Sequence, residues 1–162
     1  MPTPEFILAL RDKIGHDLLW LPGVTAVVLD DEERVLLVRR ADDGCWTLVA
    51  GVLEPGEQPA VGIVREILEE TGVEAVVESL VGVESLPPSA YPNGDRVQYL
   101  DITFRCRPVG GYARVNDEES TEVGWFGIDE LPDIPAREVR CVANALRGGT
   151  TPWFVTPSEA VS

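Results

Sequence analysis

Three glutamates, Glu66, Glu69 and Glu70, lie within five consecutive residues of a segment that has helical periodicity. A helix advances about 100° per residue, so these three carboxylates share one face. Carboxylates on a rigid face are the ligands that a hard cation such as Mg²⁺ prefers, with waters and phosphate oxygens completing its shell. Spacing alone fits either such a metal site or a solvated acidic surface.

The acidic face is costly for an ordinary surface helix. Glu66 and Glu70 are like charges four residues apart, and such a pair destabilises a helix by a few tenths of a kcal/mol. The opposite face carries apolar residues, among them Ile63 and Ile67. We therefore predict a helix from Gln58 to Thr71 that packs one face into a core and gathers negative charge on the other.

Several other chemistries are excluded by residue type. His16 is the only histidine, which rules out histidine-rich zinc sites and His-based triads. Cys45, Cys106 and Cys141 are far apart and outside metal-ligand spacing, which is typical of free thiols in a reducing cytoplasm. We accordingly expect a cytoplasmic protein.

The overall charge argues against polyanionic partners. The chain of 162 residues has a net charge of −15, so no basic surplus is available to displace counterions from nucleic acid or from an anionic membrane. No apolar run reaches the roughly 20 residues of a membrane helix, and the first residues lack the shape of a signal peptide.

The predicted elements suggest one α/β domain with a mixed sheet between helices. We expect a helical extension over 1–20, a main domain over 21–147 and a loosely ordered tail over 148–162. Apart from the acidic helix, the expected helices cover 5–15 and 135–146. The expected strands cover 24–29, 34–39, 46–49, 73–86, 96–107 and 121–127, the first two forming a hairpin.

Residues 51–73, GVLEPGEQPAVGIVREILEETGV, resemble a complete Nudix box. Gly51, Glu57, the Arg65-Glu66 pair and the terminal Gly72-Val73 all stand at the spacing of that family. The similarity extends over about residues 22–135. One departure is Leu48-Val49-Ala50-Gly51, where many relatives have Leu-Pro-Gly-Gly.

The resemblance implies an α/β/α sandwich and one or more bound Mg²⁺ or Mn²⁺ ions. Glu69 and Glu70 are then expected as the principal ligands, and Glu66 as a ligand or as the base for the attacking water. The carbonyl of Gly51 is expected to complete the metal shell. Arg65 is expected to orient the acids in a supporting catalytic role.

The family often takes a further carboxylate from a later loop. Residues 116–122, NDEESTE, occupy that position here. Glu119 and Glu118 are the first candidates for this catalytic carboxylate, and Glu122 is the next.

Substrate contacts are expected from three residues. Tyr91, in the loop over 87–95, is suited to stacking on a nucleobase, and Trp46 or Arg39 to lining the same pocket. Ala50 before the box glycine also occurs in relatives that act on ADP-ribose.

The expected function is therefore metal-dependent hydrolysis of a diphosphate linkage in a nucleoside diphosphate joined to another moiety, such as ADP-ribose. Nucleoside triphosphates and dinucleoside polyphosphates are alternative substrates. A catalytically inactive, nucleotide-binding regulator is the alternative class, and an isoprenoid diphosphate isomerase lacks a supporting cysteine pattern. Because Nudix proteins are frequently homodimers, a homodimer is expected, with the helix over 5–15 packing on its own sheet or on a second copy.

Overall fold

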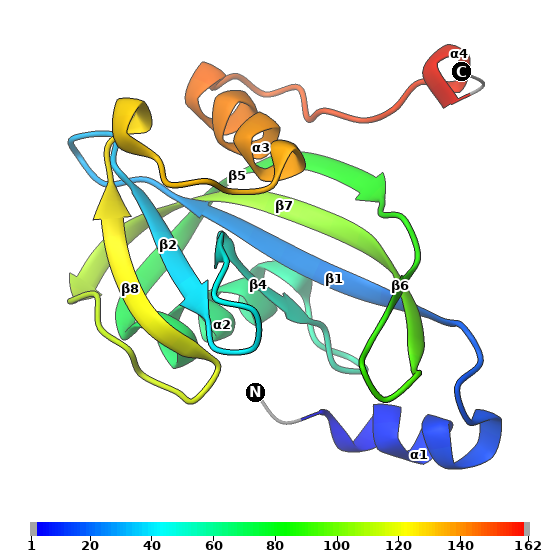
Figure 1. Ribbon diagram of the computed structural model, residues 1–162. Coiled ribbons are helices and arrows are strands. Elements are labelled where there is room, and N and C mark those ends of the chain that lie inside the picture. The colour runs from blue at the N-terminus through cyan, green and yellow to red at the C-terminus, as the bar shows by residue number, and fades with distance from the viewer. Residues whose placement is uncertain (1–2, 161–162) are drawn as a thin grey trace.

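Two β-sheets form the centre of the computed structural model, which describes residues 3–160 (Figure 1). The larger sheet has the order β4 (Val49–Val52), β1 (Leu19–Val28), β7 (Arg96–Gly111) and β5 (Val73–Ser85), with β6 (Ser89–Ala90) also pairing with β7. The smaller sheet has the order β3 (Trp46–Thr47), β2 (Val35–Arg40) and β8 (Ser120–Phe126).

Parallel and antiparallel pairing occur together in the larger sheet. β1 runs parallel to β7 over ten residue pairs, from Leu19 opposite Val97 to Val28 opposite Cys106. β4 pairs with β1, and β5 with β7, in antiparallel register. The mixed sheet that the sequence predicts is therefore confirmed.

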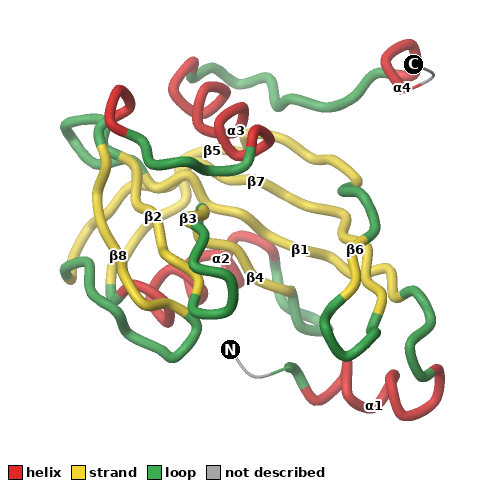
Figure 2. The backbone as a smooth tube through the Cα atoms, viewed as in Figure 1, coloured by secondary structure: helices red, strands yellow, loops and turns green. Residues whose placement is uncertain are grey.

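The helices α2 (Pro59–Thr71) and α3 (Ala136–Arg147) cover the sheet from opposite sides (Figure 2). Successive side chains of a strand point to opposite faces. Alternate residues of β1, represented by Val24 and Ala26, accordingly pack with α2 in one buried cluster, while Val27 packs with α3 in another. This layering agrees with the predicted α/β/α arrangement.

The predicted hairpin between the first two strands is wrong. β1 and β2 belong to different sheets, and only an isolated bridge between Leu29 and Val35 joins them. Both strands are buried on both faces along most of their length, because each lies between two layers. Such continuous apolar runs carry no alternation that would assign the pairing partner.

The remaining elements are short. They are α1 (Glu5–Ile14), the 3₁₀ turn η1 (Ile128–Glu130) and α4 (Pro157–Ala160). α1 packs on its own chain, with Ile7 buried against Leu21 and Val97. Arg11 of α1 also donates to the carbonyl of Arg96, at 2.6 Å. Among the described helices, none has the length and apolarity needed to cross a membrane.

Candidate active site

A cleft of about 970 Å³ opens between the start of α1, the ends of β1 and β2, the segment around Gly51 and the beginning of α3. Glu66 and Glu70 of α2, and Glu118 and Glu119 of the loop before β8, also line it. The cleft therefore brings together the predicted helical acids and the predicted loop acids, although about 50 residues separate them in the chain.

Gly51 and Glu66 meet at the wall of this cleft. β4 holds Gly51 beside α2, and a Cβ atom at position 51 would overlap the carboxyl group of Glu66. Only glycine therefore allows the Glu66 carboxylate to lie against the backbone here. The predicted carbonyl donor and one predicted carboxylate are thus neighbours.

Glu66 and Glu70 are buried acids, 1% and 5% exposed. Burial raises the pKa of Glu66 to about 7, and the adjacent Arg65 opposes this rise. Burial, followed by repulsion from Glu66 and Asp117, raises the pKa of Glu70 to about 8. Burial is the main cause in both cases, because it disfavours the charged form of each carboxyl group.

Arg65 ties the acids of this segment together. Its Nε and Nη2 donate to the two carboxylate oxygens of Glu57, at 2.7 and 3.0 Å. Its Nη1 donates to Glu66 at 2.9 Å and to Glu69 at 3.2 Å. The bidentate bond from Arg65 holds the pKa of Glu57 below its usual value. This geometry suits Arg65 to orienting the acids.

Glu69 occupies a different environment from the other two box acids. Its side chain is 44% exposed, pairs with Arg65, and lies outside the lining of the cleft. The sequence placed Glu69 and Glu70 together as principal ligands, whereas the structure brings Glu66, Glu70 and Gly51 together.

The donor set fits a divalent cation. Two buried carboxylates and a carbonyl are hard oxygen donors, and Mg²⁺ or Mn²⁺ commonly completes its shell with waters and substrate phosphates. A cation would also compensate the charge that raises the pKa of Glu70. Within residues 3–160, no three Asp, Glu, His or Cys side chains form a complete cation cage. The residues present therefore fit an ion that is shared with substrate.

The acidic loop is attached to the end of α2. The Asn116 side chain donates to the carbonyls of Leu68 and Glu69, at 3.0 and 3.1 Å, and the Arg114 amide donates to the carbonyl of Thr71 at 2.9 Å. This attachment places Glu118 and Glu119 in the cleft.

Two other acids of this loop differ from the expectation. Glu122 forms an ion pair with Arg39, at 2.6 Å, and lies outside the cleft lining. Asp117, which the sequence did not single out, is close enough to raise the pKa of Glu70. Its position in the acidic run was the available indication.

Of the predicted substrate residues, Tyr91 lines the cleft, and Arg39 and Trp46 do not. Tyr91 is 49% exposed, and its hydroxyl lies 3.0 Å from that of Tyr99. Trp46 packs edge-on against Phe126, with a centroid distance of 4.9 Å.

Strand alternation explains the position of Arg39. Val38 and Arg40 both line the cleft, so Arg39 between them points the other way. Arg40 donates from Nε to the Asp42 carboxylate at 2.9 Å, and this hydrogen bond raises the pKa of the guanidinium.

Cleft residues from the later part of the chain were not predicted from the sequence. Asp101 of β7 and the first-turn residues Arg137 and Glu138 of α3 line it. Glu138 accepts a hydrogen bond from the Leu48 amide at 2.7 Å. The polar Asp101 within an apolar strand was the only indication in the sequence.

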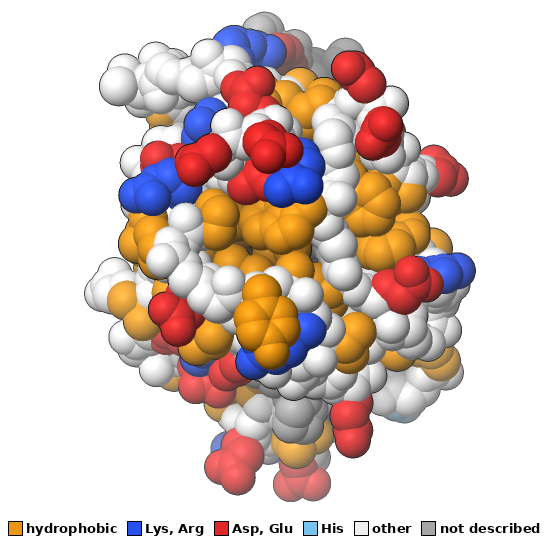
Figure 3. Space-filling view, turned by 90° about the vertical axis from the view of Figure 1, so that its left-hand side faces the viewer, with side chains coloured by type: hydrophobic (Ala, Val, Ile, Leu, Met, Phe, Trp, Pro, Cys, Tyr) orange, Lys and Arg blue, Asp and Glu red, His pale blue; other side chains and the backbone are white. Residues whose placement is uncertain are grey.

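The molecular surface is mainly acidic. On the face shown in Figure 3, Asp and Glu side chains are scattered around an apolar centre, and Lys and Arg form no continuous patch. This distribution agrees with the net charge of −15.

Known proteins resemble this chain in sequence and fold. Residues 19–144 match the family model described as NUDIX domain. A MutT-like protein of Streptomyces ambofaciens is 42% identical over 68% of this chain and 66% of its own length. The chain thus spans slightly less than two thirds of that relative.

Two further relatives are matched over most of their length. A putative 8-oxo-dGTP diphosphatase of Bacillus subtilis is 32% identical over 88% of this chain and 90% of its own. An ADP-ribose pyrophosphatase of Methanocaldococcus jannaschii is 30% identical over 87% of this chain and 83% of its own.

A solved NUDIX hydrolase from Nitrosomonas europaea is 29% identical, with a TM-score of 0.66 over 83% of this chain and 93% of that one. The family model covers the cleft residues from β1 into α3, and the cleft residues of the α1 region lie before it. The chain therefore belongs to the NUDIX hydrolase family.

Proposed function

We propose that the protein is a divalent-metal-dependent hydrolase that cuts the diphosphate linkage of a nucleoside diphosphate joined to another moiety, with ADP-ribose as the preferred substrate. The observation that carries this proposal is the meeting of Gly51, Glu66 and Glu70 at one wall of a cleft large enough for a nucleotide.

Charge is the central difficulty of the reaction. A diphosphate repels a nucleophile, and the acids of the cleft add to that repulsion. Bound Mg²⁺ or Mn²⁺ supplies charge neutralisation and a lowered pKa for a coordinated water. Glu66, Glu70 and the Gly51 carbonyl would hold this ion, and Arg65 keeps Glu66 oriented through the 2.9 Å hydrogen bond.

The proton of the attacking water goes to a carboxylate. Glu119 is the first candidate for this base because it lines the same cleft as Glu66 and Glu70, and Glu118 lines it too. Glu66 is the alternative base. On the opposite side, the exposed ring of Tyr91 is suited to stacking on a nucleobase.

The preference for ADP-ribose is supported by Ala50 before Gly51 and by the Methanocaldococcus relative, which is named an ADP-ribose pyrophosphatase. The Bacillus relative, named a putative 8-oxo-dGTP diphosphatase, favours nucleoside triphosphates as the second candidate class.

A substrate panel with Mg²⁺ or Mn²⁺ tests the proposal. We expect the highest kcat/KM on ADP-ribose, with release of AMP and ribose phosphate. A nucleoside triphosphate that is better by tenfold, about 1.4 kcal/mol of transition-state preference, would overturn the substrate. Tight nucleotide binding without turnover would instead identify a regulator.

We also propose a cytoplasmic homodimer. Cys45, Cys106 and Cys141 are free thiols, as in a reducing compartment. Leu8 and Trp20, which are 55% and 54% exposed, give the N-terminal region apolar surface for a second copy. Light scattering that shows a monomer across micromolar concentrations would reject the dimer.

A further inference from the structure

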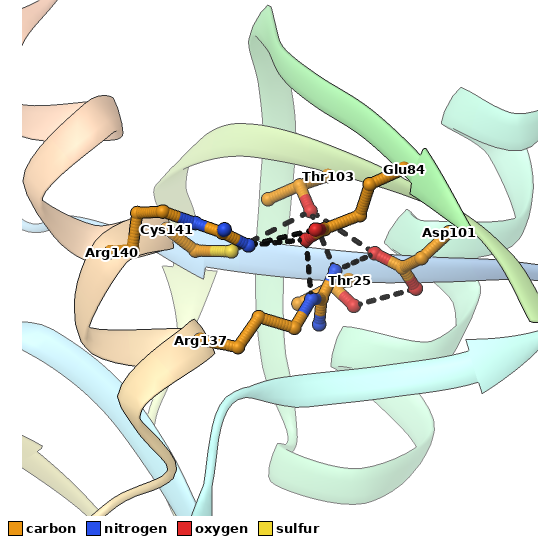
Figure 4. Close-up of polar contacts among 7 residues, drawn as sticks. All are labelled: Thr25, Glu84, Asp101, Thr103, Arg137, Arg140 and Cys141. Atoms are coloured by element: carbon orange, nitrogen blue, oxygen red, sulfur yellow. Dashed lines mark hydrogen bonds and ion pairs between the residues drawn. The ribbon is translucent and has the colours of Figure 1, made fainter. Parts of the chain in front are cut away.

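Arg137 stands at the cleft between two carboxylates from neighbouring strands (Figure 4). Its Nε donates to Glu84 of β5 at 2.6 Å, and its Nη2 donates to Asp101 of β7 at 2.5 Å. Thr25 and Thr103 donate to the two oxygens of Asp101, at 2.9 and 3.1 Å. The hydrogen bonds to Glu84 and Asp101 therefore determine the position of the Arg137 guanidinium.

Glu84 is shared with a second guanidinium. Arg140, one turn along α3, donates from Nη2 to both oxygens of Glu84, at 2.7 and 2.8 Å. The Glu84 side chain is 13% exposed, so its charge is balanced mainly by these two arginines. A change at Arg140 consequently alters how strongly Glu84 attracts Arg137.

Arg140 is covered by a residue of the C-terminal tail. Its guanidinium carbon lies 4.0 Å from the centroid of the Trp153 ring. Its Nε is the only buried side-chain nitrogen or oxygen in the described part of the chain that has no hydrogen-bond partner. The π face of the indole is the group that offsets this deficit.

Trp153 is fixed by the edge of the sheet. Its amide donates to the carbonyl of Val81 at 2.8 Å, and its carbonyl accepts from the amide of Val83 at 3.1 Å. The backbone approaches so closely that a Cβ atom at Gly82 would lie 2.9 Å from the Trp153 oxygen. The tail is therefore seated on β5, and the ring is seated on Arg140.

We propose that Trp153 is a positioning residue for the substrate cleft, acting through Arg140 and Glu84 on Arg137. The inference rests on the proposed function only in taking this cleft as the substrate site. Arg137 and Asp101 line the cleft, whereas Trp153 does not. Without the indole, Arg140 becomes hydrated and releases Glu84, which then draws Arg137 away from Asp101. Substrate binding weakens, while the box acids keep their geometry.

The test compares Trp153→Ala, Trp153→Phe and the matched control Phe154→Ala. Phe154 is the adjacent residue, 58% exposed, and it makes no ring contact with Arg140. We expect Trp153→Ala to raise the KM for ADP-ribose about fivefold, which corresponds to the free energy of one cation–π contact. The kcat of this variant should stay within about twofold of the wild-type value. Trp153→Phe should recover most of the loss, and Phe154→Ala should match the wild type.

A double-mutant cycle separates positioning from a general structural effect. In an Arg137→Ala background, Trp153→Ala should cause no further change in KM, because the path ends at Arg137. Additive effects of the two substitutions, or equal effects of Trp153→Ala and Phe154→Ala, would overturn the inference. If Trp153→Ala does not fold, Trp153→Leu, which keeps an apolar side chain without a π face, takes its place in the cycle.

The dissociation constant of a non-hydrolysable ADP-ribose analogue, measured by calorimetry with Mg²⁺ present, supplies a second readout that needs no turnover. If the wild type binds ADP-ribose but does not hydrolyse it, the proposed function fails, and the same variants still test the role of Trp153 through binding. Absence of binding to the wild type would overturn both proposals.

Discussion

The backbone of Gly51 lies against the carboxylate of Glu66 so closely that no side chain fits between them. This contact joins the edge strand β4 to the middle of α2, and it places a carbonyl and a carboxylate at one wall of the cleft.

Gly51→Ala should therefore displace Glu66. We expect kcat to fall by about 100-fold, as for a shift of about 1 Å in a catalytic group, and stability to fall by about 1–3 kcal/mol from overpacking. Gly127→Ala is the matched control, because Gly127 lies outside the cleft lining and a Cβ atom there would be 3.8 Å from the nearest atom, so its rate should stay within about twofold. Steady-state rates and melting curves check both, and an active Gly51→Ala would contradict the contact.

Glu70→Gln should lower kcat by at least about 100-fold at saturating Mg²⁺, because a neutral amide does not balance the charge of a cation. Glu69→Gln should have a smaller effect, since Glu69 is half exposed and outside the cleft lining. Circular dichroism establishes that the fold is intact. Near-normal turnover by Glu70→Gln would sink the assignment of the metal site.

One acid of the loop over 116–122 should be essential. We expect Glu119→Gln or Glu118→Gln to reduce kcat by about 10²–10⁴-fold, the usual contribution of a general base, with little change in Tm. Glu122→Gln serves as the control, because Glu122 is engaged by Arg39. If all three variants keep wild-type rates, the base lies within the box, at Glu66.

Arg40 and Arg39 form a natural matched pair, since they are adjacent and point to opposite faces of β2. Arg40→Gln should raise the KM for a diphosphate substrate about tenfold, through loss of a charged hydrogen-bond donor in the cleft. Arg39→Gln should leave KM near the wild-type value. The reverse order of effects would restore Arg39 as a substrate residue.

Glu138 should make stability depend on pH. Burial raises its pKa to about 7 from 4.5, so the folded protein binds more protons than the unfolded chain between these values. Glu138 therefore contributes on the order of 3 kcal/mol to the free energy of unfolding below pH 4.5. This contribution is lost as the pH rises through 7. Glu138→Gln should therefore flatten the wild-type decrease in melting temperature between pH 5 and 8. Parallel curves for the two proteins would contradict this shift.

Local patterns sufficed for α2 and for the positions of its acids. The period of Ile63 and Ile67 fixes which face is buried, and Gly72, in a left-handed conformation, ends the helix. The acidic loop was also recognisable, because its run of carboxylates precedes the last strand.

Features that depend on distant parts of the chain were not predictable. Arg39 was preferred to Arg40 because the sequence does not show which face of β2 meets the cleft. The roles of Arg137 and Asp101 require knowing that α3 packs over β7, a contact between segments more than 30 residues apart. The placement of β1 and β2 in different sheets likewise depends on which distant strands pair with each of them.

The bonds from Asn116 and Arg114 to the last carbonyls of α2 have a consequence for motion. These hydrogen bonds attach the acidic loop to the box helix, so we expect the two segments to move together. Any opening or closing of the cleft is then left to the opposite wall, where α1 and the loop carrying Asp95 are linked through Arg11. We therefore expect the acids of the box helix and of the loop to keep their mutual distances when that wall moves.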